Sequence, residues 1–182
     1  DGTIIEKKGT WGPMDPKNSQ GRWDLTGIGK IIVTTPDGII VECEGTWGPM
    51  DPTNPEGSWH LTGNATKIEK KPDGTIIEKK GTWGPMDPKN PQGPWRLTGK
   101  GKIIETKPDG TIIECEGTWG PMDPKNPQGL WHLTGKGKII ETKPDGTIIE
   151  CEGTWGPMDP KNPQGPWHLI KHDRCSRKRK RK

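Results

Sequence analysis

Ten tryptophans supply all the aromatic surface of this chain, which contains neither Phe nor Tyr. They form two sets that each recur every 36 residues, and one set lies in the phrase GTWGPMD, which starts at residues 9, 45, 81, 117 and 153. Indole rings can stack on sugars, apolar side chains or bases. We therefore take the tryptophans as a candidate binding face, with the alternative that they only cover a glycine-rich sheet: Trp11, Trp23, Trp47, Trp59, Trp83, Trp95, Trp119, Trp131, Trp155 and Trp167.

The basic C-terminal end is the second candidate site. Residues 171–182 carry eight Lys or Arg residues against one Asp, whereas residues 1–170 carry 20 Lys or Arg against 23 Asp or Glu. Such a run suits an import receptor, nucleic-acid phosphates or an anionic membrane surface, and it is expected to be disordered alone. Its six consecutive cations are Arg177, Lys178, Arg179, Lys180, Arg181 and Lys182.

The histidines do not resemble catalytic groups. His60, His132 and His168 each follow a Trp, and the equivalent residues in the other repeats are Asp24 and Arg96. A position that accepts His, Arg or Asp is not under a catalytic requirement. Alternation along a strand would point these side chains to the polar face. We find no spacing of nucleophile and base and no phosphate loop, and we predict neither an enzyme nor a cofactor.

The polar loops and the cysteines also argue against a metal site. Asp123, Asn126 and Gln128 could approach a cation, but this loop lacks the carboxylate density of a calcium site. Three of the four cysteines share one repeat position, which is Lys in the other two repeats, and no C-x-x-C spacing occurs. We therefore predict free thiols in a reducing compartment for Cys43, Cys115, Cys151 and Cys175.

The repeated unit has the period of a β-hairpin. In residues 95–131, apolar and polar residues alternate on both sides of the turn Lys107–Gly110, whose Pro-Asp-Gly sequence favours a type I turn followed by a glycine with positive φ. If Lys107 faces Thr111 across this turn, Gly99 faces Trp119. An indole can then lie over bare glycine backbone.

The same register brings two lysines together in the middle repeat. Lys67 would face Lys79 on the apolar face, where other repeats pair Ile103 with Cys115. Like charges directly opposite each other are destabilising when they are buried. We therefore expect this part of the apolar face to be reached by water.

These patterns predict an all-β protein, an elongated antiparallel sheet of about ten strands built from five tandem 36-residue hairpin repeats in residues 1–170. The first strand would be Thr3–Trp11 and the last Trp167–His172, followed by a disordered basic tail over residues 171–182. All ten tryptophans would share one face. A closed ten-stranded up-and-down barrel has the same alternation and stays open as the alternative. The chain starts at Asp1 inside a turn motif, without an initiator Met, as a piece of a longer protein would.

The string GKGKIIETKPDGTIIECEGTW resembles the MORN (membrane occupation and recognition nexus) repeat. The matching residues are Gly135, Gly137, Asp145, Gly146, Gly153 and Trp155, with equivalents in the other copies. The chain departs from that family in its longer period, in Cys151 where an aromatic is usual, and in an apparent insertion over residues 157–167. The resemblance implies stacked hairpins in a single sheet and a scaffold role, in some members at membranes.

We expect a non-enzymatic repeat scaffold that binds a protein partner, with the tail as a nuclear localisation signal or anion tether. Five equivalent sites at a fixed spacing would favour polyvalent partners. The alternatives are a multivalent Trp-based carbohydrate-binding module and a peripheral membrane-surface protein. We expect the protein to be intracellular, and the tail favours the nucleus. The sequence leaves the partner and the oligomeric state undecided.

Overall fold

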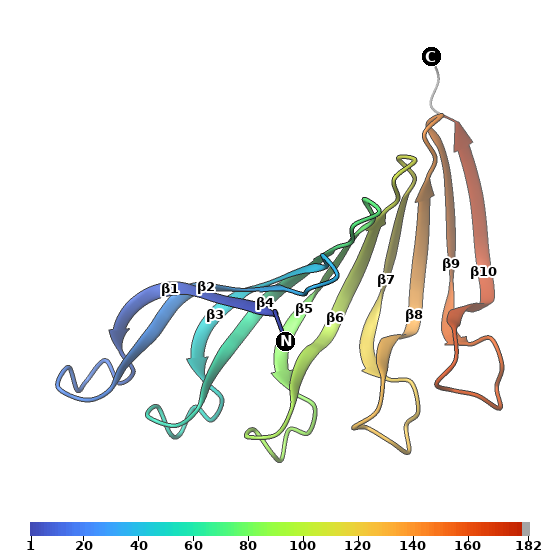
Figure 1. The fold of residues 1–182 in the computed structure, drawn as a ribbon. Coiled ribbons are helices and arrows are strands. Elements are labelled where there is room, and N and C mark those ends of the chain that lie inside the picture. Colours follow the sequence, from blue (N-terminus) through green and yellow to red (C-terminus); the bar gives the residue numbers. More distant parts are fainter. Residues whose placement is uncertain (180–182) are drawn as a thin grey trace.

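The computed structural model describes residues 1–179 and is a single open antiparallel sheet of ten strands (Figure 1). Neighbouring strands in the sheet are also neighbours in the sequence. The all-β prediction and the ten-strand sheet are confirmed. The strands are β1 Ile4–Pro13, β2 Trp23–Thr34, β3 Ile40–Pro49, β4 Trp59–Lys70, β5 Ile76–Pro85, β6 Trp95–Thr106, β7 Ile112–Pro121, β8 Trp131–Thr142, β9 Thr147–Pro157 and β10 Trp167–Arg179.

Tight turns connect each even strand to the next odd strand, as the Pro-Asp-Gly sequences predict. Gly110 has a φ of 92°, its N–H donates to the Lys107 carbonyl, and the Lys107 N–H donates to the Thr111 carbonyl. The other turns repeat this pattern. The predicted register follows from the turn, with Gly99 opposite Trp119 and Lys67 opposite Lys79.

A bulge recurs at one level of the sheet. Between β5 and β6, Lys80 pairs with Lys102 and Thr82 with Thr98, so that Gly81 alone lies opposite the three residues 99–101. Gly99 has a φ of 70°, in the left-handed region that other residues rarely adopt. Equivalent shifts occur between β1 and β2, β3 and β4, and β7 and β8. Across the bulge β5 advances by two residues and β6 by four. Both numbers are even, so the same side chains stay on the same face of the sheet on both sides of the bulge.

Four of the five tryptophans of the GTWGPMD set pack backwards onto the preceding hairpin at this level. The Trp119 ring crosses β6 and reaches β5, where its Nε1–H donates to the Lys80 carbonyl at 2.8 Å. A Cβ built on Gly101 would lie 1.9 Å from Nε1 of Trp119, and one on Gly81 would lie 2.7 Å from it. A side chain at either position would overlap the indole as it is placed here. Trp47, Trp83 and Trp155 make the same hydrogen bond, in each case 39 residues back.

The second repeat contains a natural variant of this contact. Ala65 takes the place that Gly29, Gly101 and Gly137 have in the other repeats. Trp83, which packs next to it, is only half-buried, whereas Trp119 is buried. The Trp83 hydrogen bond is also the longest of the four, at 3.0 Å. One methyl group therefore loosens the contact without abolishing it.

The closed barrel is wrong, because β1 and β10 are the two edges of the sheet. In a barrel Trp11 would have to cover glycines of the last hairpin, but the residue 36 positions after Gly137 is Asp173. Trp11 is instead 64% exposed. The chemistry of the Trp–Gly contact therefore disfavours closure.

The longer loops are ordered rather than loose. In the first loop Lys17 N–H donates to Asp15 Oδ1, Asn18 N–H to the Asp15 carbonyl, and Gly21 N–H to the Asn18 carbonyl. The other loops repeat these backbone bonds. Pairing between β2 and β3 stops at Gly27 and Trp47, so the loop ends of neighbouring hairpins project as separate arms (Figure 1).

The predicted disordered tail is wrong for residues 171–179, which continue β10 to Arg179 along β9. The last strand therefore ends seven residues beyond the predicted His172. Residues 180–182 lie outside the described part of the chain. Arg174 is opposite Glu152 and Ser176 opposite Glu150, so the acidic residues of β9 offset the charge that was expected to keep the segment unpaired. None of the described residues forms a helix long and apolar enough to cross a membrane.

Gly101→Ala should lower the free energy of unfolding by roughly 1–3 kcal/mol, because the new methyl group overlaps the Trp119 ring and forces an adjustment of the packing. Chemical denaturation followed by Trp fluorescence measures this. Thr118→Ala, an exposed position on the opposite face, is the matched control and should change stability by less than about 0.5 kcal/mol. Equal stability of Gly101→Ala and the parent would contradict the contact.

Candidate binding groove

The predicted tryptophan face exists, but packing uses most of it. Trp47, Trp119 and Trp155 are 5–8% exposed, and the Trp59, Trp83, Trp95, Trp131 and Trp167 side chains are half-buried. In the second set the indole Nε1–H donates to a carbonyl of the preceding loop, as Trp95 does to Pro91 at 2.7 Å. Only Trp11 and Trp23 are exposed. The indoles therefore serve chiefly as the core of the sheet.

The residue after each tryptophan of the second set joins neighbouring hairpins, which the sequence analysis missed. The prediction that His60 and His132 point to the polar face is wrong, since the His60 ring lies 5.6 Å from Trp83 and the His132 ring 5.5 Å from Trp155. Arg96 lies as a cation 5.4 Å from the Trp131 ring, in the place where His60 approaches Trp95 and His132 approaches Trp167. The arms are unpaired at this end, which frees the side chains to turn toward the next hairpin. The sequence signal that could have indicated this contact is the recurrence of His or Arg directly after Trp every 36 residues.

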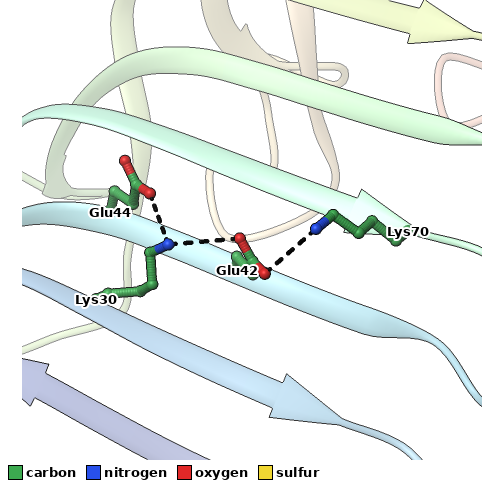
Figure 2. Close-up of polar contacts among 4 residues, drawn as sticks. All are labelled: Lys30, Glu42, Glu44 and Lys70. Atoms are coloured by element: carbon green, nitrogen blue, oxygen red, sulfur yellow. Dashed lines mark hydrogen bonds and ion pairs between the residues drawn. The ribbon is translucent and has the colours of Figure 1, made fainter.

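The opposite face of the sheet is polar and carries ion pairs between strands (Figure 2). Lys30 on β2 lies 3.6 Å from Glu42 and 3.0 Å from Glu44 on β3, and Lys70 on β4 lies 3.4 Å from Glu42. The hydrogen bond to Glu44 and the charges of both glutamates raise the pKa of Lys30. Related pairs recur in later repeats, between Lys102 and Glu114 or Glu116 and between Lys138 and Glu150.

A groove of about 1140 Å³ crosses this polar face from β2 to β9, at the level of the bulges. Glycines of neighbouring strands, among them Gly45, Gly81 and Gly117, line it and bring the backbone to its surface. Thr46, Thr82 and Thr118 line it as well. These threonines are exposed, and their hydroxyls make no hydrogen bond among the described residues. The groove therefore offers an ordered row of free polar groups.

A second row in the groove varies from repeat to repeat. It consists of Ile28, Asn64, Lys100 and Lys136, each 36 residues after the last. All four side chains are exposed, and Ile28 is 87% exposed. Neither Lys100 nor Lys136 has an ion-pair partner within the described residues. This row is where near-identical repeats present different chemistry at the same place.

The cysteine prediction is partly wrong. Cys151 and Cys175 form a disulfide between β9 and β10, whereas Cys43 and Cys115 are free. Cys151 and Cys175 lie 36 residues after Cys115 and Ile139, which are opposite each other in β7 and β8, so the repeat period was the signal for this pairing. Burial raises the pKa of the Cys115 thiol to about 11, and it also raises that of Cys43. Both free thiols are therefore weak nucleophiles at neutral pH.

Lys67 and Lys79 face each other as predicted, and both are half-buried. Burial and the charge of Lys67 lower the pKa of Lys79. The described residues contain no group of three or more His, Cys, Asp or Glu side chains that could hold a metal ion. In the basic tail Arg177, Lys178 and Arg179 are exposed along β10, and Lys180, Arg181 and Lys182 lie outside the described residues.

No family model, curated protein or solved structure matches this chain. The resemblance to the MORN repeat therefore stays a prediction. The geometry of the chain itself has to carry the functional proposal.

The stability of the sheet should fall with acidification through His132. Burial lowers the pKa of this imidazole below its ordinary value of 6.5. The unfolded chain then binds the proton more readily, so the contribution of His132 is complete above pH 6.5 and is lost as the pH falls below it. The free energy of unfolding between pH 7.5 and 5 should drop less in His132→Gln than in the parent. Parallel curves for the two proteins would contradict this role.

Proposed function

We propose that this protein is a non-enzymatic scaffold that binds a protein partner along the polar groove. The observation that carries the proposal is the groove itself, which crosses most of the strands and is lined by equivalent residues from successive repeats. A site of this shape suits an extended chain rather than a compact small molecule, because each repeat adds one more set of contacts in line.

The packing of the sheet supports a rigid binding surface. Interlocked Trp rings on one face hold the glycine backbones that line the groove on the other. A rigid surface costs a partner less ordering entropy than a mobile one. Threonine hydroxyls, lysines and backbone groups at this surface can satisfy the polar groups of a peptide.

The structure supports the alternative functions suggested by the sequence less well than it supports the scaffold. A Trp-based carbohydrate site needs open indole faces, and eight of the ten indoles are buried or half-buried. The exposed Arg177, Lys178 and Arg179 favour the tail as a second, separate site for an import receptor or an anionic surface. Comparing the cellular distribution of the chain with and without residues 177–182 tests that role, and an unchanged distribution would remove it.

An unbiased peptide library panned against the immobilised protein tests the main proposal. Enriched peptides should bind the parent and lose at least about tenfold in affinity for Thr82→Trp/Thr118→Trp, because the two indoles would fill the groove. The matched control is Gln92→Trp/Gln128→Trp, which places the same side chains on exposed loop positions 36 residues apart. Peptides should bind this control as they bind the parent.

Circular dichroism and thermal unfolding verify that both variants keep the sheet. Two results would overturn the proposal. One is the absence of any enriched peptide, and the other is enriched peptides that bind the groove variant and the loop control equally well.

A further inference from the structure

We propose that the segment bound in this groove is a polyproline II helix that carries two acidic side chains three residues apart. The inference rests on the proposed function and names the chemical class of its partner. It follows from the spacing of the repeats and from the charges left unpaired in the groove.

The spacing of the repeats matches one turn of polyproline II. Lys100 and Lys136 occupy equivalent positions on β6 and β8, which are two strands apart. Strands in a sheet lie ~4.8 Å apart, so equivalent residues are separated by ~9.6 Å. A polyproline II helix rises ~3.1 Å per residue with three residues per turn, and thus repeats every ~9.3 Å. Residues i, i+3 and i+6 of such a helix would face successive repeats.

An extended β-strand partner does not fit this arrangement. Its side chains alternate between two faces, so residues i and i+3 point in opposite directions. In addition, a β-strand needs a partner strand for its backbone hydrogen bonds, whereas the strands beneath the groove already pair with one another. Polyproline II has no internal hydrogen bonds. The free hydroxyls of Thr82 and Thr118 are placed to donate to its carbonyl oxygens at the same repeat.

The charges in the groove select acidic side chains. Two of the groove carboxylates, Glu44 and Glu116, are already ion-paired, with Lys30 and Lys102. A third, Glu152, lies opposite Arg174 in the register of β9 and β10. Lys100 and Lys136 are exposed and unpaired among the described side chains, so they are the charges available to a ligand. Two carboxylates one helical turn apart would satisfy both.

The other two residues of the row, Asn64 and Ile28, suggest what the peptide carries beyond its two acidic residues. Asn64 and Ile28 continue the line of Lys136 and Lys100 at the same spacing. Asn64 can hydrogen-bond a polar residue, and the exposed Ile28 can contact an apolar one. The preferred peptide therefore has two acidic residues, one polar residue and one apolar residue at successive three-residue intervals. An acidic polysaccharide also has regularly spaced carboxylates, but among the described residues no aromatic ring lines the groove to stack on a sugar.

Fluorescence anisotropy with labelled synthetic peptides tests the inference. The probe is (Glu-Pro-Pro)₄, and the control is (Glu-Pro-Pro-Pro)₄, which has the same charge but the wrong interval. The first should bind roughly three- to tenfold more tightly, and its affinity should fall as the salt concentration rises. Lys100→Gln/Lys136→Gln should lose that preference. Lys89→Gln/Lys125→Gln removes the same charge from exposed loop positions and should keep it.

Equal binding of the two peptides would overturn the inference, because charge alone would then explain the affinity. Tighter binding of a uronic-acid polysaccharide than of (Glu-Pro-Pro)₄, with loss in Lys100→Gln/Lys136→Gln, would also overturn it. If neither proline peptide binds while library peptides still bind the groove, the inference fails and the proposed function stands. If library peptides also fail to bind, both fail.

Discussion

The sheet depends on the contact between an indole ring and glycine backbone in the preceding hairpin. Trp119 covers Gly101 and Gly81 and donates its Nε1–H to the Lys80 carbonyl at 2.8 Å. The chain has few large apolar residues, so no conventional core can form around this contact. Because the residues beneath the ring are glycines, a single indole can cover two strands and donate its Nε1–H to a backbone carbonyl. Because every such contact points toward the N-terminal neighbour, the repeats stack in one direction and the sheet remains open.

The same glycines have a second consequence on the opposite face. They line the groove at the level of the bulges, together with Thr and Lys side chains of paired strands such as Thr118, which is opposite Lys100. The packing of the Trp face and the shape of the groove thus depend on the same glycines. An insertion or deletion that changed the 36-residue period would displace both together. The repeats differ most in chemistry on the groove face, at Ile28, Asn64, Lys100 and Lys136, whereas beneath the indole the one change is Ala65 for glycine.

The sequence allowed the strands, the turns, the register and the common face of the tryptophans to be predicted, since each follows from local rules. Pro-Asp-Gly sets the turn, the turn sets the register, and period-two alternation sets the face. Contacts between the loop arms of neighbouring hairpins could not be obtained this way. The edge-to-face contact of His132 with Trp155 arises only because these arms are unpaired, which the alternation rule does not describe. The groove also depends on the bulges, which place Gly81 alone opposite three residues.

The C-terminal segment was predicted to be disordered from its basic composition, and its place in the repeat, where a strand is expected, was not considered. Residues 171–179 read as a solvated basic run, yet they occupy the place of a strand whose neighbour β9 presents glutamates, and Cys175 falls opposite Cys151. In a repeat protein the period is the stronger constraint, since each unit supplies a template for the next. Composition is the better guide to whether a segment is ordered where no neighbouring repeat is available to pair with it.

Hydrogen exchange of the indole N–H groups, followed by NMR, tests the central contact most directly. Trp47, Trp83, Trp119 and Trp155 donate to carbonyls 39 residues back, two strands away, whereas the exposed Trp11 makes no such bond to the described residues. We expect slow exchange for these four indoles and fast exchange for Trp11. Similar exchange rates at all five would contradict the account.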